Sequence, residues 1–535
     1  MDPALPRPLA ALAVCLALAA LAGAASAHWH GVPADFDLRN YHLYDGVALL
    51  RGRIFTDLAP AQLQTYYAPL LDVLYVLALD ALNRHPAALG AILALPQGLA
   101  AFLAAWLAAR MLPATIPARR AILAACALAA VTGAAGASTF AGPMSEMLPA
   151  SCVLGALLAL GAAPPRPAWA GMLAGIAVGL KLTMMPFAAG LALEAAFARP
   201  PARARFAAAA LAGAALTAGW WWAWLWVRFD NPIFPYFNDL FASPWGARLS
   251  GIDTRFLPRD IIQAAAYPLF WAFHATTLVT EAPARDPRIA LGWFAVGTLL
   301  VRRETRSRAR PMLCVWTLGY VLWEPVFSVL RYLASLELIL PALLAALFAP
   351  VLARARPWLA ACGAWALAVA LIAATVLPEW GHAPPGPRAI AVRPPHFTPG
   401  TLVVLLDWSP MAYVAAFAPR SVRFVGADNN LVVPGAPDLL SRAVATAIRD
   451  QRGPTWGLEE DRATADRALA AYHLRRAPGC VRVRSNLDGN AIRACPLVRL
   501  RPPSVRTRRE SRRHPLPPLR FHRDLYRQRS FPARG

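Results

Sequence analysis

The feature that most constrains this chain is a series of apolar blocks, each about 16–30 residues long, which fill most of its first 380 residues. A helix needs about 20 apolar residues to cross the hydrocarbon core of a bilayer. Backbone groups in lipid must also find hydrogen-bond partners within their own segment, which a helix provides. The blocks therefore predict a mainly α fold, a polytopic membrane helical bundle.

Counting the blocks gives eleven spans, and a total of eleven to thirteen stays open. The first block ends in Ala25-Ser26-Ala27, which resembles a signal-peptidase site, but its length favours an uncleaved first helix. The stretch 264–280 is ambiguous between a span and a segment lying along the membrane interface. The blocks lie at 8–27, 67–82, 87–109, 121–137, 145–162, 168–197, 206–227, 288–301, 311–329, 332–352 and 357–377.

Short arginine-rich loops orient these spans, because lysine and arginine accumulate on the cytoplasmic side of a membrane. The loops 199–205, 302–310 and 354–356 are expected inside, and eleven crossings place all three there. The same count puts the basic loop 110–120 outside, unless one of the early blocks is short or re-entrant. An odd total places residues 380–535 outside.

Composition agrees with this class of protein. Hydrophobic residues make up 58% of the 535 residues and charged residues only 16%, too few to cover a soluble chain of this size. The formal net charge is +23, and the tail 501–535 alone holds eleven arginines against Glu510 and Asp524. No module combines aromatic and basic residues as nucleic-acid-binding proteins do, so we expect no nucleic-acid partner.

The C-terminal region lacks apolar blocks and is expected to form a small soluble α/β domain outside the membrane. Cys480 and Cys495 lie in it, 15 residues apart, and an oxidising compartment would favour a disulfide between them. The expected parts are a Pro-rich linker over 381–400, strands over 401–407 and 421–427, helices over 438–451 and 460–474 within the domain 401–500, and a disordered basic tail over 501–535.

The first outer loop, 28–66, concentrates polar side chains. Such a set at a membrane surface can bind a polar substrate carried by a lipid, whereas the alternative is a hydrated loop in which Asp37 caps a helix over 38–50. A second outer loop, 228–287, is rich in Phe, Pro and Trp and is expected at the level of the lipid headgroups. The polar residues of the first loop are Asp35, Asp37, Arg39, His42, Asp45, Asp57, Gln62 and Gln64.

Two cations in apolar surroundings complete the candidates. Lys181 is the only lysine of the chain and lies in GLKLTMMPF, either as a functional group at membrane depth or reaching to the interface. Arg331, followed by Tyr332, lies between Glu324 and Glu337. The planar guanidinium of an arginine suits a phosphate, although a structural Arg–Glu pair between helices is an equal alternative.

Four regions of the chain contain the strings DLRNYHLYDGVALLRGR with QTYYAPLLDVLY, GLKLTMMPF, DNPIFPYFNDLFASPW with DTRFLPRD, and RYLASLELILP. Together these strings resemble the GT-C superfamily of glycosyltransferases. The resemblance covers roughly residues 1–380 and is greatest to bacterial glycosyltransferase 87 or RgtA/B/C/D-like mannosyltransferase-type membrane proteins. The C-terminal domain takes little part in it.

The resemblance implies a multi-pass enzyme of the bacterial inner membrane with a catalytic domain over 1–380. Such an enzyme takes a sugar from a polyprenyl-phosphate donor and passes it, with inversion at the anomeric carbon, to a lipid, glycan or protein acceptor on the outer face. The acidic residue that acts as the base in this superfamily maps to Asp37 or to Asp35. Some relatives have an Asp-Glu pair where this chain has Asp-Phe-Asp, so the choice stays open.

The donor would be bound by the first loop and the two cations. We expect Arg39, His42, Gln64, Lys181, Arg331 and Tyr332 to bind the substrate or the lipid phosphate, and membrane lipids to be further partners. The donor carries no nucleotide, and the chain has neither a P-loop nor a dinucleotide fingerprint. No metal ligands are predicted, and a divalent metal remains a possible cofactor.

Two other functions compete with sugar transfer, and a purely structural membrane protein is a further alternative. A lipid-linked sugar flippase or transporter would be expected to contain paired repeats with broken helices, and no convincing two-fold repeat is present. An oligosaccharide polymerase or ligase would share the acidic loop and the lipid-phosphate site.

Overall fold

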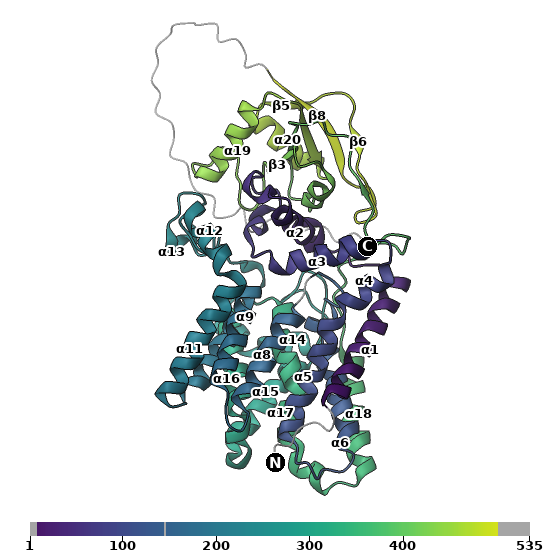
Figure 1. Ribbon diagram of the computed structural model, residues 1–535, viewed down its shortest axis with the longest axis vertical. Helices are drawn as coiled ribbons and strands as arrows, with labels where there is room; N and C mark the ends of the chain where they lie inside the picture. The colour runs from purple at the N-terminus through teal and green to yellow at the C-terminus, as the bar shows by residue number, and fades with distance from the viewer. Residues whose placement is uncertain (1–7, 144–145, 501–535) are drawn as a thin grey trace.

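The computed structural model describes residues 8–143 and 146–500, and the predicted tail 501–535 lies outside them. The described chain is mainly helical, with a small mixed sheet in its C-terminal part (Figure 1). Within it, five helices are long and apolar enough to cross a membrane: Pro8–Trp29, Pro86–Met111, Pro200–Phe229, Leu330–Arg354 and Pro357–Ala374. Shorter apolar helices lie at Met147–Leu160, Pro167–Leu180, Leu182–Ala196, Ile261–Phe273 and Arg288–Val301.

Small residues allow several of these helices to approach closely. Helix α1 (Pro8–Trp29) packs on α4 (Pro86–Leu93) through Gly23, where an added Cβ would lie 2.2 Å from the Gly90 carbonyl oxygen. Helix α9 (Pro167–Leu180) packs along α11 (Pro200–Ala214), with Gly171 against Phe206 and Gly175 against Ala210. Both contacts advance in the same direction, so α9 and α11 run parallel.

The apolar block 168–197, predicted as one span, contains two helices. Helix α9 ends at Lys181, whose backbone is extended, and α10 (Met185–Ala196) follows a short 3₁₀ turn. Pro186 lies in the first turn of α10, where a missing N–H costs no hydrogen bond. Since α9 and α11 are parallel and α10 connects them in the chain, α10 runs antiparallel to both.

The block 67–82, also predicted as a span, takes a different position. It forms α3 (Leu70–Leu82), which packs against α2 (Leu43–Leu50). Figure 1 shows both helices between the long helices and the C-terminal part. The sequence could not show this, because α3 is as apolar as the helices below it.

The C-terminal part contains a sheet with the strand order β3-β2-β4-β8-β5. Strand β2 (Leu402–Leu405) is parallel to β3 (Arg423–Gly426) and β4 (Thr455–Glu459), whereas β8 (Arg493–Arg499) is antiparallel to β4 and to β5 (Leu474–Arg476). Helices α19 (Leu439–Asp450) and α20 (Arg462–Ala471) fall where the sequence predicts helices. Strands β4, β5 and β8 were not predicted.

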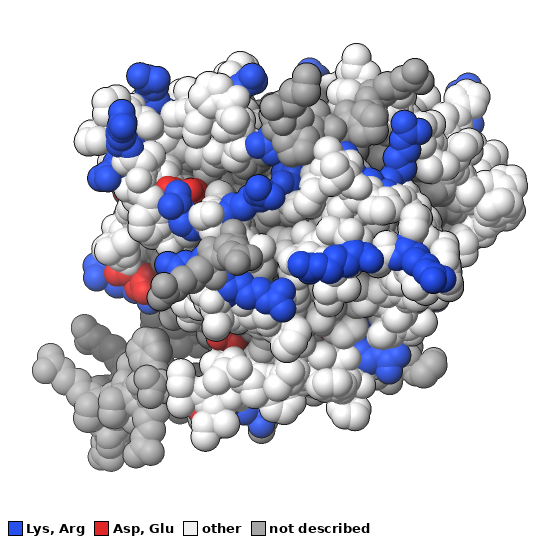
Figure 2. All heavy atoms as spheres, turned by 90° about the horizontal axis from the view of Figure 1, so that it is seen from below, with Lys and Arg blue, Asp and Glu red and all other residues white. Residues whose placement is uncertain are grey.

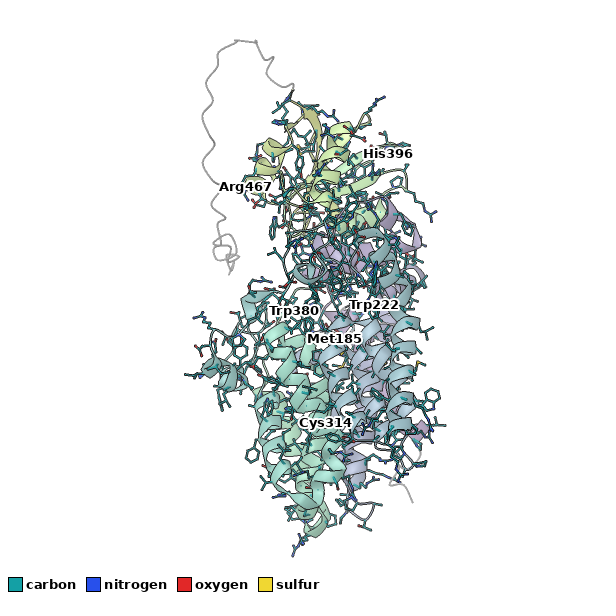
Figure 3. The ribbon with its side chains drawn as sticks, turned by 90° about the vertical axis from the view of Figure 1, so that its left-hand side faces the viewer. Met185, Trp222, Cys314, Trp380, His396 and Arg467 are labelled. Carbon is teal, nitrogen blue, oxygen red and sulfur yellow. A yellow bond between two sulfur atoms is a disulfide. The ribbon has the colours of Figure 1, made fainter. Side chains whose placement is uncertain are left out.

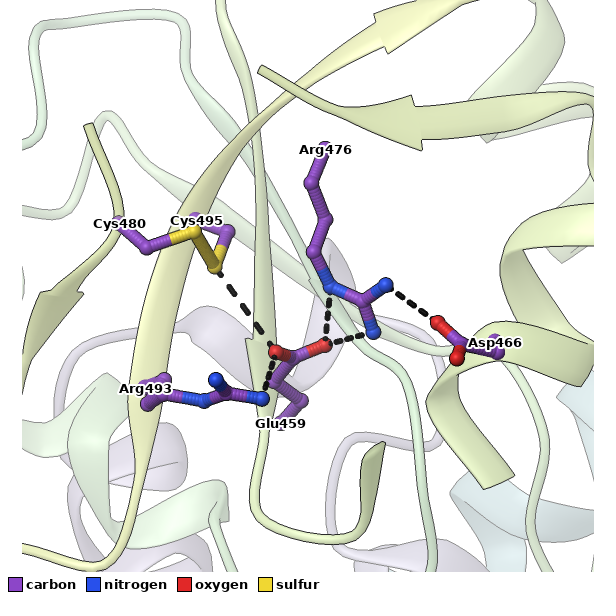
Figure 4. Close-up of a disulfide and its surroundings, with 6 residues drawn as sticks. All are labelled: Glu459, Asp466, Arg476, Cys480, Arg493 and Cys495. Carbon is purple, nitrogen blue, oxygen red and sulfur yellow. Dashed lines mark hydrogen bonds and ion pairs between the residues drawn. A yellow bond between two sulfur atoms is a disulfide. The ribbon is translucent and has the colours of Figure 1, made fainter. Parts of the chain in front are cut away.

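A disulfide joins Cys480 to Cys495 beside a buried charge cluster (Figure 4). Glu459 is fully buried at the end of β4. Its two oxygens accept hydrogen bonds from Arg476 and, at 2.7 Å, from Arg493. A buried carboxylate is tolerated only when its charge is paired and its oxygens are hydrogen-bonded, and here both conditions are met.

The Pro-rich segment 381–400 is held by both parts of the molecule. Asn83, just after α3, bonds with its side chain to the backbone N–H and the carbonyl oxygen of Ile390. Two residues later, β1 (Val392–Arg393) pairs with β7 (Arg484–Ser485). The segment therefore forms a fixed connection and not a free tether.

The C-terminal part docks on the first loop through buried polar contacts. Arg53 is 2% exposed and donates to the carbonyl oxygens of Val422 and Ala418 at 2.7 and 2.8 Å. Leu58 pairs with Val425 of β3 in a parallel bridge. The first loop thus continues the sheet at its β3 edge.

The opposite end of the molecule carries arginines with few acidic residues, as Figure 2 shows from below. In Figure 1 this end contains the turns between α5 (Leu95–Met111) and α6 (Arg119–Val131), between α15 (Arg288–Val301) and α16 (Arg303–Val326), and between α17 (Ala334–Arg354) and α18 (Pro357–Ala374). The basic loop 110–120 therefore shares an end with 302–310 and 354–356.

Candidate functional site

The candidate site lies where the first loop meets the ends of several helices. The loop enters it through the π-helix η1 (Leu38–His42), and the helical part contributes the 3₁₀ turn η7 (Leu330–Leu333) and the break at Lys181. In Figure 3, Met185 and Trp380 mark this level, while Cys314 lies well inside the helical part. Several helices end at this level, so the chain turns here and the residues of these turns lie close to one another.

Asp37 and Arg331 form the central ion pair. The Asp37 Oδ2 atom lies 2.9 Å from the Arg331 Nη2 atom, and both side chains are nearly buried. On its other side the Arg331 Nε atom lies 3.9 Å from Glu146 Oε1. A planar guanidinium can face two anions at once, which Lys cannot do in the same geometry.

Lys181 joins the same network through Glu146. Its Nζ atom lies 2.5 Å from Glu146 Oε1, and Glu146 is fully buried. Two cations and two carboxylates from four separate segments therefore share one enclosed region. Each pair is neutral, which lowers the cost of burying the charges.

Two aromatic rings lie beside these charges. The Tyr332 ring lies 5.8 Å from Lys181 Nζ and 5.3 Å from the Arg331 guanidinium carbon, and the Trp380 ring lies 5.9 Å from that carbon. Aromatic faces attract cations and can equally stack on a sugar ring through their apolar surface.

Three further tyrosines lie on the side of the first loop. The hydroxyls of Tyr67 and Tyr236 are hydrogen-bonded, and Tyr236 comes from the late loop 228–287. The Tyr41 ring lies 5.3 Å from that of Tyr67. The two predicted outer loops thus meet at this site.

Asp35, the second candidate for the base, has a local structural bond. Its Oδ1 atom accepts a hydrogen bond from the N–H of Leu38 at 2.9 Å, at the start of η1. Burial raises the pKa of Asp35, and the nearby charge of Asp37 raises it further. Asp37 therefore contacts Arg331, whereas Asp35 stabilises the start of η1.

His42 pairs with Asp72, which the sequence did not single out. The His42 Nδ1 and Asp72 Oδ1 atoms are 2.6 Å apart, and His42 Nε2 has no hydrogen-bond partner in the described structure. Asp45, one turn further, is 1% exposed and both its carboxylate oxygens lack a partner there. Burial, followed by the charge of Asp72, raises the pKa of Asp45 well above its ordinary value.

Two predicted binding residues lie apart from the ion pairs. Burial raises the pKa of Glu460 in the C-terminal part, and the charge of Arg39 opposes that rise, so Arg39 faces that part of the molecule. Gln64 lies in the 3₁₀ helix η3 (Gln62–Tyr66), and its Oε1 atom is buried without a partner among the described residues. The ion-pair partner of Asp37 is Arg331 and not Arg39.

Sequence reasoning left out Glu146 and Asp72 as site residues. Both are carboxylates inside or at the edge of apolar blocks, which is the signal that singled out Lys181. Glu146 stands at the start of the predicted span 145–162. Its partner could not be chosen, because the side of the membrane to which it belongs depended on the early topology.

Neither a metal site nor a known relative identifies further residues of the candidate site. Within residues 8–143 and 146–500, no group of three or more His, Cys, Asp or Glu side chains is arranged to hold a metal ion. Comparisons of the chain with family models, with curated proteins and with solved structures find no match.

Proposed function

We propose that this chain is a multi-pass membrane glycosyltransferase of the GT-C type, which transfers a sugar from a polyprenyl-phosphate donor to an acceptor at the outer face of a bacterial inner membrane. The observation that carries the proposal is the network Asp37–Arg331–Glu146–Lys181. It offers a carboxylate for a proton and two cations for a phosphate, at one level of a helical bundle.

The arrangement of the helices supports the orientation. With α3 left out and the block 168–197 counted as two antiparallel helices, the number of crossings that we propose is eleven. The basic loop 110–120 then belongs to the cytoplasmic side together with 199–205, 302–310 and 354–356, which agrees with the bias of arginine in inner loops. The first loop and the C-terminal domain share the outer side.

The reaction can be written with these residues. The acceptor hydroxyl oxygen forms a bond to the anomeric carbon while the bond from that carbon to the phosphate oxygen breaks. The hydroxyl proton passes to the carboxylate of Asp37, and the electron pair leaves with the polyprenyl phosphate. A general base of this kind contributes roughly 10²–10⁴-fold to a rate.

The ion pairs at rest explain how the base becomes available. In the structure Arg331 is paired with Asp37 and Lys181 with Glu146. A donor phosphate competes for the guanidinium and the ammonium, which stabilise the charge that develops on the leaving group. Arg331 then turns from Asp37 to the phosphate, and the carboxylate is left to accept the proton.

The test is sugar transfer by the purified full chain with radiolabelled polyprenyl-phosphate sugars. Asp37→Asn is expected to lower the turnover at least about 100-fold, because an amide cannot accept the proton. Asp35→Asn is expected to lower it less, and Asp450→Asn, which alters an exposed side chain on α19, serves as the control. Wild-type rates in both Asp37→Asn and Asp35→Asn would show that neither carboxylate is the base.

Lys181→Met separates phosphate binding from a structural role. If Lys181 holds the donor phosphate, the variant raises KM for the donor more than it lowers kcat. Unchanged donor affinity would show that Lys181 pairs with Glu146 for a structural reason and does not bind the donor. A wild-type chain that transfers no sugar but moves labelled lipid-linked sugar between leaflets would instead show a transporter.

A further inference from the structure

A second site lies on the other side of the first loop. An open groove of about 770 Å³ runs between that loop, the end of α12 (Trp220–Phe229), strand β3 and helix α19. It shares no residue with the network around Asp37. Its lining residues are Phe55, Thr56, Leu58, Arg228, Arg423, Leu439, Arg442, Ala443, Thr446 and Ala447.

Three arginines from three separate elements line this groove, and no lining residue is acidic. Arg228 ends α12, Arg423 begins β3 and Arg442 lies in the first turn of α19. All three are exposed, and none forms an ion pair within the described chain. Asp57, in a cavity beside the groove, supplies one negative charge near Arg423, so the three arginines still leave a net positive charge around the hollow. An anion that binds between them would lower their mutual repulsion.

The arginines are held in place by neutral groups. Arg423 donates to the carbonyl oxygen of Thr56 at 3.1 Å. The Arg228 guanidinium lies 4.0 Å from the centre of the Trp245 ring. Both contacts restrain the side chain and leave its charge unpaired, as a preformed anion site requires.

The rest of the groove is apolar and continues towards the helices. An adjoining cavity of about 190 Å³ adds Trp224 and Phe229 of α12, together with Ile54, Asp57 and Tyr66 of the first loop. Trp220 lies on the same side of α12 as Trp224 and Arg228, at four-residue spacing, and is 42% exposed. Tryptophans of this kind concentrate at the level of lipid headgroups. The groove therefore opens where a lipid could present its phosphate to the arginines and its chain to α12.

We propose that this groove binds the phosphate headgroup of an anionic lipid, whose hydrocarbon chain lies along the exposed face of α12. The inference rests on the membrane location within the proposed function but not on sugar transfer. Arginine is suited to this ligand because its fork donates two hydrogen bonds to one phosphate. The phosphate could also come from a soluble ion, and the binding assay separates the two sources.

The probe is a short-chain phosphatidylglycerol, titrated into the detergent-solubilised full chain and followed by native mass spectrometry. Arg442→Gln is expected to weaken binding about tenfold, which is about 1.4 kcal/mol and close to the lower end of what one hydrogen bond to a charged group contributes. Arg228→Gln combined with Arg442→Gln should weaken it by about the product of the two. Arg449→Gln, on the same helix but paired with Asp450, is the matched control.

Four results would overturn the proposal. Binding unchanged in the double variant would show that the groove is not the site. Equal weakening by Arg449→Gln would show a general charge effect. Inorganic phosphate that competes as well as the lipid would show a site for soluble anions. Equal binding of phosphatidylcholine would show that the negative charge of the headgroup is not recognised.

A separate variant keeps this result independent of sugar transfer. Arg331→Gln should abolish transfer and leave phosphatidylglycerol binding unchanged, since Arg331 is not in the groove. If the wild-type chain transfers no sugar yet binds phosphatidylglycerol through Arg228 and Arg442, the proposed function fails and the groove remains. If the wild-type chain transfers sugar and the groove variants bind phosphatidylglycerol normally, the proposed function stands and the groove proposal fails.

Discussion

At the scale of single residues, the first loop separates three carboxylates by their surroundings. Asp37 is paired with Arg331, Asp35 accepts a backbone N–H, and Asp57 lies under the C-terminal part. The sequence places all three in one hydrophilic loop and cannot rank them. Only the partners contributed from distant segments assign each carboxylate a different role.

Asp57 predicts a pH dependence of stability. Burial raises its pKa from the ordinary 3.8 to about 6, against the opposing effects of the Phe424 N–H and of Arg53. The folded chain therefore holds the proton more tightly than the unfolded chain, so this contribution is complete below about pH 4 and is lost as the pH rises to about 6. The full difference is about 3 kcal/mol.

The measurement is the thermal unfolding midpoint of the detergent-solubilised chain between about pH 4 and pH 7, the window that this pKa shift sets. Asp57→Asn should remove the part of the pH dependence that the wild type shows in this window. Asp450→Asn, which alters an exposed carboxylate, should keep it. A wild-type profile that rises through the same window in parallel with that of Asp57→Asn would contradict the assignment.

At the scale of elements, the sequence predicts much of the helical part and misses where some segments go. Apolar length identifies helices such as α1, α17 and α18. It cannot tell that α3 stays at the upper level, or that α9 and α10 are separate, because a helix is apolar in either case. Strand β4 could not be predicted because TWGLE has no long apolar run. Its place in the sheet comes from pairing with β2 along one edge and with β8 along the other.

The candidate site was predictable only in part for a similar reason. Unusual residues in apolar blocks, such as Lys181 and Arg331, were visible in the sequence. Lys181 pairs with Glu146, 35 residues earlier in the chain, and Arg331 pairs with Asp37, 294 residues earlier. No local pattern encodes contacts of that range.

The packing of α9 against α11 gives a prediction at this scale. A Cβ at Gly175 would lie 1.9 Å from the carbonyl oxygen of Ala210, in rigid backbone. Gly175→Ala should therefore destabilise the chain by roughly 1–3 kcal/mol, as overpacking of a close contact does. Gly363→Ala on α18, where an added Cβ meets nothing within 4 Å, should stabilise it by up to about 1 kcal/mol through helix propensity.

Both variants are compared by thermal unfolding in the same detergent. Opposite shifts of the midpoint would show that close packing, and not glycine flexibility, governs Gly175. A gain in stability for Gly175→Ala equal to that of Gly363→Ala would mean that α9 and α11 do not pack this closely.

At the scale of the whole molecule, the two ends differ in charge and in structure. One end carries arginines in short turns, and the other carries the first loop, the late loop and the C-terminal domain. The proposed orientation places the first end in the cytoplasm. This assigns every described loop to one side of the membrane, so a labelling experiment can test it.

The experiment uses single cysteines in a chain whose five free cysteines are replaced by serine, with the disulfide kept. A membrane-impermeant maleimide applied to intact cells should label Gly489→Cys in the C-terminal domain. It should label Thr115→Cys, at an exposed position in the turn between α5 and α6, only after the membrane is permeabilised. Labelling of both positions in intact cells would disprove the proposed orientation.

The docking of the C-terminal domain also bears on how the chain folds as it is made. Arg53 is bound to the carbonyl of Val422, 369 residues later. At a synthesis rate of roughly 5–20 residues per second, about 20–70 seconds pass between the two. During that interval the loop that carries Asp37 has no sheet to pack against. The contacts between that loop and the C-terminal part can therefore form only after the segments that supply Glu146, Lys181 and Arg331 have been synthesised.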